Sequence, residues 1–264
     1  MKTSGNTILI TGGSSGIGFE FAKQFVAAGN TVIVTGRDEK KLQKVKAALP
    51  AVHVVKSDVS SPDEIGALLK KITGEFPALN VLINNAGVMR NINMHDDSVT
   101  LEALTHEIDI NLKGPMRMAK AFLPHLKKQA EAAIVNVTSG LAFVPLPISP
   151  VYCATKAGLH SFSLSLRVQL KNTKVKVFEV APPATATELL SDMNADDMKG
   201  VAIMQVGDMV AASIKGLAQD RLEIRPGQAN NLKFMSRVAP EFILKQLSKP
   251  VDRMLAQSGA GAGR

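Results

Sequence analysis

The chain has 264 residues, of which 45% are apolar, so it can bury the core of one large domain. This composition excludes an intrinsically disordered protein, and no apolar run approaches the roughly 20 residues that a membrane crossing needs. Because the N-terminus also lacks the layout of a secretory signal, we expect a cytoplasmic protein. The single cysteine, Cys153, can form neither an internal disulfide nor a cysteine-ligated metal site, so we expect no metal.

Lysine and arginine together number 31 and acidic residues 23, which gives a formal net charge of +8. Such an excess is compatible with a nucleic acid, an acidic membrane surface or a phosphorylated small molecule as partner. The basic residues lie within helix-like stretches that also hold acidic residues, and no basic stripe is interleaved with aromatic residues. We interpret them as solvated helix faces and expect no nucleic acid and no membrane span.

Short β-branched runs alternate with longer amphipathic stretches along most of the chain. This alternation predicts an α/β fold, a Rossmann-type doubly wound sheet of about seven mainly parallel strands with helices on both faces. The predicted strands span residues 7–11, 31–35, 52–57, 81–84, 133–138, 175–180 and 222–225. The predicted helices span residues 16–28, 40–49, 62–76, 101–129, 151–171 and 206–218.

No composition shift marks a domain linker, so we expect one dinucleotide-binding catalytic domain over residues 1–257. Within it, a loop over about residues 183–205 is expected to border the substrate. The glycine- and alanine-rich segment 258–264 is expected to be a disordered tail.

A glycine motif over residues 11–18 joins the first predicted strand to the first predicted helix. Gly12 would permit the tight turn, Gly16 would let the backbone approach a pyrophosphate, and Gly18 would let the helix pack on the strand. The free N–H groups at the start of the helix would then bind phosphate. A glycine-rich turn with a purely structural role is the alternative for this motif alone.

Tyr152 and Lys156 are four residues apart in a predicted helix, so they lie one turn apart on the same face. An ammonium group beside a phenol favours phenolate, and we expect it to lower the tyrosine pKa from about 10 toward neutrality. Ser149 and Pro150 resemble a helix start, which would add the positive end of the helix dipole. This suits a general acid, although an exposed tyrosine beside a lysine is the alternative.

The combination of T-G-x-x-x-G-x-G at residues 11–18 with Y-x-x-x-K at residues 152–156 resembles the short-chain dehydrogenase/reductase family. The sequence Asn-Asn-Ala-Gly at residues 84–87, Asn111 in a helix and Ser139 at the end of a strand fall where that family carries its other motifs. The resemblance covers about residues 6–226. Within the family, the chain most resembles the DltE-like oxidoreductases.

The resemblance implies an oxidoreductase that reduces a ketone or aldehyde to an alcohol, or runs the reverse reaction. Ser139 would hydrogen-bond the substrate carbonyl, and Tyr152 would donate a proton to its oxygen. Lys156 would tune Tyr152 and hold the nicotinamide ribose, and Asn111 would anchor a water molecule that relays protons. Alone, Ser139 could simply end a strand, and Asn111 could cap or kink a helix.

The choice of cofactor depends on Arg37 and Asp38, which follow the second predicted strand. An arginine here favours the 2′-phosphate of NADP, whereas a carboxylate about twenty residues after the glycine motif favours NAD. Asp38 is better explained as the N-cap of the next helix, so we expect NADP(H), with NAD(H) possible. Asp58 resembles the family aspartate that binds the adenine amino group, although it could instead be a loop cap.

The resemblance also implies a wider set of cofactor contacts. They are Gly12, Ser14, Ser15, Gly16, Ile17, Gly18, Arg37, Asp58, Val59, Asn85, Ala86, Gly87, Tyr152, Lys156, Pro182, Ala184, Thr185 and Thr187. The chain departs from the family at Pro183, where a glycine is usual. Proline has no N–H donor, so contacts to the nicotinamide carboxamide would depend more on Ala184, Thr185 and Thr187.

Substrate pockets in such folds lie beyond the carboxyl ends of the strands. The candidates for contact with substrate are Ser139, Leu141, Phe143, Val144, Tyr152 and Pro183. Because residues 140–151 contain no arginine, we expect an uncharged ketone or aldehyde. Several of these residues could instead pack a loop or a subunit contact, and residues 193–204 could form a mobile lid.

Two other functions remain compatible with the motifs: a nucleotide-sensing binding protein on the same scaffold and a basic nucleic-acid binder. The combination of Asn111, Ser139, Tyr152 and Lys156 favours the enzyme, since a sensor has little use for it. The family resemblance further implies a homodimer or homotetramer, formed through the helices near residues 114–129 and 151–171.

Overall fold

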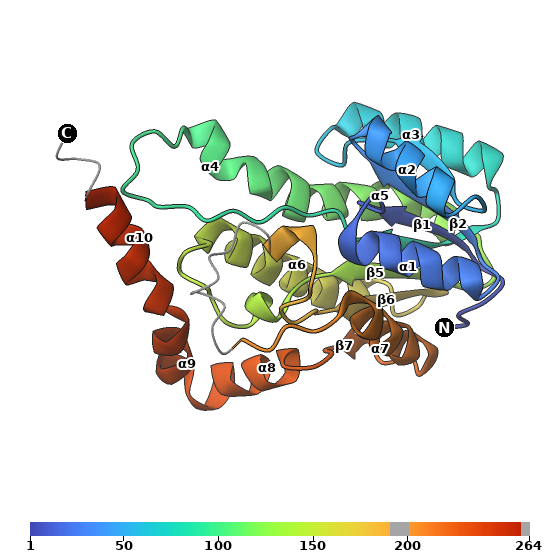
Figure 1. Ribbon diagram of the computed structural model, residues 1–264. Coiled ribbons are helices and arrows are strands. Elements are labelled where there is room, and N and C mark those ends of the chain that lie inside the picture. Colours follow the sequence, from blue (N-terminus) through green and yellow to red (C-terminus); the bar gives the residue numbers. More distant parts are fainter. Residues whose placement is uncertain (191–200, 260–264) are drawn as a thin grey trace.

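A parallel sheet of seven strands lies at the centre of the computed structural model, which describes residues 1–190 and 201–259 (Figure 1). The strands are β1 (Thr7–Thr11), β2 (Thr31–Gly36), β3 (His53–Lys56), β4 (Leu79–Asn84), β5 (Ala132–Val137), β6 (Val175–Val180) and β7 (Glu223–Ile224). Their spatial order is β3-β2-β1-β4-β5-β6-β7. The predicted doubly wound, Rossmann-type sheet is therefore confirmed.

The chain order reverses beside β1, which pairs with β2 on one side and with β4 on the other. In parallel sheets, ligands bind beyond the carboxyl ends of the strands at such a switch point. Asn84 at the end of β4 is aligned with Asn136 near the end of β5. Residues that follow β1, β4 and β5 are therefore brought to one edge of the sheet.

Helices cover both faces of the sheet because the strands are apolar on both sides. On β1, Ile8 and Ile10 point to one face and Leu9 to the other. The first face is covered by α1 (Gly16–Ala27), α2 (Glu39–Ala48) and α7 (Val206–Ala218). The second is covered by α3 (Pro62–Glu75), α5 (Gly114–Leu126) and α6 (Pro150–Gln169).

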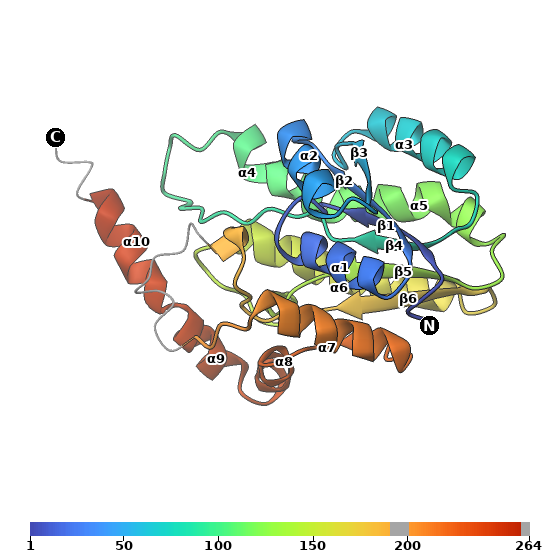
Figure 2. The same cartoon turned by 45° about the vertical axis from the view of Figure 1, so that its right-hand side comes forward.

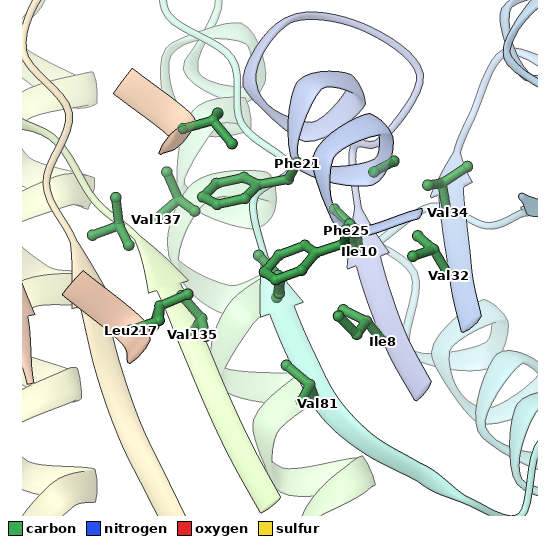
Figure 3. Close-up of a cluster of buried hydrophobic side chains, with 14 of the residues drawn as sticks. Ile8, Ile10, Phe21, Phe25, Val32, Val34, Val81, Val135, Val137 and Leu217 are labelled. Atoms are coloured by element: carbon green, nitrogen blue, oxygen red, sulfur yellow. The ribbon is translucent and has the colours of Figure 1, made fainter. Parts of the chain in front are cut away.

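Figure 3 shows the core on the first face, where the rings of Phe21 and Phe25 in α1 lie over the strands. The two rings are stacked with their centroids 5.9 Å apart, and both side chains are fully buried. Leu217 of α7 completes this cluster near Val135. Burial of this kind stabilises the fold by about 1.5–3 kcal/mol for each large side chain, and it holds the start of α1 firmly at the end of β1.

The predicted helix over residues 101–129 is interrupted. The structure has α4 (Leu101–Ile108), then a π-helical turn (Asp109–Lys113), then α5. Pro115 has no N–H, so it cannot donate the regular hydrogen bond to the Asn111 carbonyl, and Gly114 packs against Val59. The interruption therefore falls at the asparagine that the sequence had singled out.

Three C-terminal helices were missing from the predicted elements: α8 (Ala229–Val238), α9 (Pro240–Leu247) and α10 (Lys249–Gly259). In both views, α9 and α10 stand at the side of the molecule away from the N-terminus (Figures 1 and 2). The first two residues of the segment expected to be a tail, 258 and 259, belong to α10. Residues 260–264, and residues 191–200 of the expected substrate loop, lie outside the described residues.

The described helices include none with the length and apolar character required to cross a membrane.

Candidate active site

A cavity of about 1200 Å³ opens at the carboxyl edge of the sheet. Its walls come from the glycine loop after β1, the segments after β2, β4, β5 and β6, the start of α6 and the C-terminal helices. Segments far apart in the sequence thus meet at the switch point of the sheet, as the topology requires.

The glycine loop needs glycine for two separate reasons. Gly12 has a positive φ of 64°, and a Cβ there would lie 2.6 Å from the Cα of Ala86. At Gly18 a Cβ would lie 2.3 Å from the carbonyl oxygen of Gly12. The structure therefore supports the predicted roles of Gly12 in the tight turn and of Gly18 in the packing of α1.

The start of α1 is able to bind an anion. Ser15 is the N-cap residue, but its side chain caps no backbone N–H, and the first backbone bond runs from Phe19 N to the Ser15 carbonyl, 3.1 Å. The preceding N–H groups of the helix therefore remain available, at the positive end of the helix dipole. Gly16, with φ 53°, lines the cavity here without a side chain. These features fit a pyrophosphate group.

Asn85 lines the cavity, and its side chain braces the glycine loop. Its amide donates to the carbonyl oxygens of Thr11 and Gly12, at 3.1 and 3.0 Å. The Thr11 hydroxyl accepts hydrogen bonds from the backbone N–H groups of Asn85 and Ala86. The loops after β1 and β4 are thereby locked together, which holds Ala86 and its neighbours on the cavity wall.

Arg37 and Asp58 face each other at the other end of the cavity, with 3.9 Å between Nη1 and Oδ2. Asp58 also caps its own loop, since its Oδ1 accepts hydrogen bonds from the N–H and hydroxyl of Ser60, both 2.8 Å. Asp38 caps α2 by accepting from Lys41 N, and this backbone hydrogen bond lowers the pKa of its carboxyl. The interpretation of Asp38 as an N-cap is confirmed.

Ser139, Tyr152 and Lys156 line the cavity together. Tyr152 and Lys156 are both buried, and the ammonium lies 5.6 Å from the centre of the phenol ring. The Lys156 Nζ donates to the Val137 carbonyl at 2.9 Å, which ties α6 to the end of β5. Ser139 follows that strand end, and its Oγ accepts from Leu141 N at 3.1 Å. The structure thus brings these three predicted residues together in one cavity.

The predicted pKa shift of Tyr152 has the wrong sign. Burial raises the pKa of the phenol above its ordinary value of 10, because a phenolate there would lose its hydration, and the nearby Ser139 hydroxyl opposes this rise only in part. Burial also lowers the pKa of the Lys156 ammonium to about 8. The nearby Lys156 amine therefore does not offset the effect of burial on the pKa of Tyr152, and the protonated phenol is favoured.

Asn111 lies just behind the cavity wall and is fully buried. Its side chain clamps the backbone of Val88, accepting from the N–H at 2.9 Å and donating to the carbonyl at 2.8 Å. It also donates to the Thr155 hydroxyl at 3.2 Å. The side-chain amide is therefore occupied by protein, whereas the Asn111 carbonyl lacks its regular helical donor because of Pro115.

A buried carboxylate that the sequence analysis missed supports the end of β5. Glu179 of β6 accepts a hydrogen bond from the Thr138 hydroxyl at 2.7 Å, and its other oxygen lies 2.8 Å from Nδ1 of His160. Thr138 precedes Ser139, and His160 lies one turn beyond Lys156 in α6. The contact between Glu179 and His160 thus joins the end of β5 to α6, and these two elements position Ser139, Tyr152 and Lys156. Glutamate within an apolar strand is the signal that could have revealed it.

The segment after β6 crosses the cavity. The Pro182 carbonyl accepts from Gly140 N at 2.7 Å, which couples it to the segment after β5. The Thr185 hydroxyl donates to the Pro183 carbonyl at 2.9 Å. Proline at position 183 is thus accommodated, and Thr187 lies near Gly16 at the phosphate end.

Most of the predicted cofactor and substrate residues line this one cavity. Those outside its lining are Gly18, Asn111, Phe143 and Val144. The Phe143 ring packs edge-on against His160, with centroids 5.1 Å apart, so it supports the site from behind. Val144 is buried in the fold.

The structure also adds lining residues that the sequence analysis missed. They include Met89, Arg90, His106, Gln228, Leu232, Ile243, Gln246, Leu247, Lys249, Pro250 and Arg253. The C-terminal stretch has apolar residues at spacings of three and four, such as Leu247, Val251 and Met254, and this pattern could have revealed the helices. In the structure these three residues pack against the cluster that contains Tyr152.

Comparison with known proteins agrees with this geometry. The family profile described as short chain dehydrogenase matches residues 6–198. The chain is 42% identical over 250 residues to the uncharacterized oxidoreductase DltE of Bacillus subtilis (strain 168), covering 94% of this chain and 98% of that protein.

Two solved structures share the fold. A short chain dehydrogenase from Burkholderia cenocepacia J2315 in complex with NADP has a TM-score of 0.81 at 24% identity, covering 95% of this chain and 100% of that one. A short chain dehydrogenase/reductase from Burkholderia phymatum in complex with NAD has a TM-score of 0.80 at 21% identity, covering 93% and 96%. The chain belongs to the short-chain dehydrogenase/reductase family of oxidoreductases, and its resemblance to DltE-like members is confirmed.

The pKa of Tyr152 can be measured directly, since the chain has one tyrosine and no tryptophan. We expect the native phenol to remain protonated at pH values where the denatured chain titrates, near about 10. Because the unfolded state releases this proton first, the free energy of unfolding should decline as the pH rises above that value. Ultraviolet absorbance of phenolate against pH, native and in urea, provides the test. The Tyr152→Phe variant is the blank, and a native pKa at or below the denatured one would contradict the assignment.

Proposed function

We propose that this protein is an NADP(H)-dependent oxidoreductase that reduces a ketone or aldehyde to an alcohol or catalyses the reverse reaction. The observation that carries the proposal is a single cavity in which Ser139, Tyr152 and Lys156 lie at one end of a site suited to a dinucleotide. A helix N-terminus with available N–H groups and a close glycine turn support a pyrophosphate at its middle.

Within this proposal, bound NADP(H) supplies or accepts a hydride ion. Tyr152 holds the proton that the substrate oxygen gains on reduction, and the raised pKa of its phenol keeps that proton in place until the oxygen becomes basic. Ser139 donates a hydrogen bond to the same oxygen. Burial of both groups excludes bulk water and strengthens their polar contacts with substrate.

Lys156 and Asn111 would replenish the proton on Tyr152. The amine of Lys156, whose pKa burial lowers to about 8, can exchange a proton near neutral pH. Pro115 deprives the Asn111 carbonyl of its regular donor, so that carbonyl is suited to hold a water molecule between Lys156 and solvent. Lys156 would also hold the nicotinamide ribose.

The preference for NADP(H) is proposed from Arg37. Its guanidinium lines the cavity, and the competing carboxylate, Asp38, already caps α2. One of the two structural neighbours binds NADP and the other NAD, so the fold alone does not decide between them. A planar guanidinium suits a phosphate group better than it suits a ribose hydroxyl.

We further propose that residues 1–257 act as one catalytic domain, with residues 183–205 bordering the substrate, in a cytoplasmic homodimer or homotetramer. The family resemblance suggests contacts through α5 and α6. In support, Leu164 and Val168 are one turn apart on α6 and are 40% and 66% exposed. A pair of exposed apolar side chains suits a subunit contact.

The variant Tyr152→Phe tests the proposed proton transfer. Removal of the hydroxyl should reduce kcat by about 10²–10⁴-fold, the usual contribution of a general acid, while the Kd for NADPH stays within about twofold. Stopped-flow NADPH oxidation with a panel of ketones and aldehydes measures the first, and fluorescence titration measures the second. Wild-type binding of NADPH without turnover of any carbonyl would favour a nucleotide sensor and contradict the proposal.

The variant Arg37→Ala tests the cofactor assignment. Loss of charge-assisted hydrogen bonds to the 2′-phosphate should raise the Kd for NADPH by about tenfold or more and leave the Kd for NADH nearly unchanged. Lys44→Ala, at an exposed position of α2 outside the cavity, is the matched control for net charge. Equal weakening of both cofactors by Arg37→Ala would refute the role of Arg37.

A further inference from the structure

Arg90 lies in the cavity wall on the segment that follows β4. Its neighbours fix this segment: Val88 is clamped by Asn111, and the Ile92 N–H donates to the Ile148 carbonyl at 2.9 Å. Met89 packs against the cluster that contains Tyr152. Arg90 is therefore held at a defined place in the substrate part of the cavity, on the same side as the catalytic tyrosine.

The guanidinium is anchored from behind but keeps most of its hydrogen-bonding capacity. Its Nη2 donates to the Ala103 carbonyl of α4, and its Nε is buried, facing Glu107 without a hydrogen bond, so the other N–H groups are the ones that can reach a ligand. A guanidinium has five N–H donors, and the Arg90 side chain is 38% exposed. A backbone carbonyl thus orients the group while leaving donors for a ligand in the cavity.

Glu107 of α4 faces the Arg90 guanidinium, and the two side chains form no hydrogen bond. Its Oε1 lies 3.8 Å from Arg90 Nε, and neither carboxyl oxygen has a hydrogen-bond partner although the side chain is fully buried. Burial raises the pKa of this carboxyl, and the charge and backbone N–H of Arg90 act against that rise. Glu107 therefore pairs with Arg90 by charge alone, without a hydrogen bond that would occupy the guanidinium.

Among the described residues, Lys249 of α10 is a further basic group on the cavity wall, beside apolar residues such as Leu247. The acidic side chains among the described lining residues are Asp38, Asp58 and Glu188, and Glu188 pairs with Lys41 at 3.0 Å. The described lining residues include more basic than acidic side chains, and together with the apolar walls this favours an organic anion.

We propose that the substrate is an oxo acid, or the corresponding hydroxy acid, whose carboxylate binds Arg90 while its carbonyl or hydroxyl group binds Ser139 and Tyr152. This inference rests on the proposed function and deepens it. It replaces the expectation of an uncharged substrate, which considered only residues 140–151. Arg90 reaches the same cavity from the segment after β4.

The test compares a homologous series of straight-chain oxo acids with their methyl esters, which keep the carbonyl but lack the negative charge. For the chain length that fits, wild-type kcat/KM should be about tenfold or more higher for the acid than for the ester, since charge-assisted bidentate contacts are strong. Arg90→Met should abolish this preference by lowering kcat/KM for the acid, with the ester changed by less than about threefold.

Two control variants separate a binding role from a structural one. Arg90→Lys keeps the charge but not the planar fork, so it should retain part of the preference. Arg221→Met removes an exposed arginine outside the cavity and should leave the preference intact. Equal loss with acid and ester in Arg90→Met, or no preference in the wild type, would overturn the inference while leaving the reductase function in place.

A binding measurement keeps the test independent of turnover. Calorimetric titration of the wild-type protein with saturated straight-chain carboxylates in the presence of NADP⁺ should show binding at the favoured chain length, and the corresponding methyl esters should bind more weakly. Absence of any carboxylate binding would also overturn the inference. If carboxylates bind but no carbonyl compound is reduced, the proposed function fails and the assignment of Arg90 to an anion site stands.

Discussion

The hydrogen bond from Lys156 to the Val137 carbonyl is the contact on which the site depends. It joins α6 to the end of β5, and these are the elements that carry Tyr152 and Ser139. The pair of Glu179 and His160 reinforces the same junction one turn further along the helix. Because the start of α1 is fixed to β1 by the stacked phenylalanines, the two halves of the cavity are both attached to one rigid sheet.

Polar groups are buried around this junction, and removing them from water has a free-energy cost that an apolar core would avoid. Asn111, Lys156 and Glu179 each offset this cost with hydrogen bonds to other elements. By contrast, Arg90 Nε and both carboxyl oxygens of Glu107 are buried without a hydrogen-bond partner within the described residues.

Motifs with a local physical basis could be predicted from the sequence. The glycine turn requires positive φ at Gly12, and Asp38 caps α2 through a bond to Lys41, so both depend on a few neighbouring residues. The spacing of Tyr152 and Lys156 sets their common helix face regardless of context. The same reasoning correctly predicted the order of strands and helices through α7, with the helix over 101–129 as the exception.

Features that depend on tertiary burial could not be predicted in this way. The pKa of Tyr152 rises because the surrounding protein removes water, which helix spacing does not reveal. Arg90 and α10 reach the cavity only through the folded path of the chain. The π-helical turn at Asn111 combines a local cause, Pro115, with close packing of Gly114 on Val59, a residue distant in sequence.

The most direct test of the central claim is a crystal structure of the protein with NADP⁺ and a bound alcohol or ketone. The account predicts that the Tyr152 and Ser139 hydroxyls both lie within about 2.6–3.2 Å of the ligand oxygen, on the side that faces the nicotinamide ring, with the pyrophosphate against the start of α1. A phenol turned away from the ring while the cofactor is seated would contradict it.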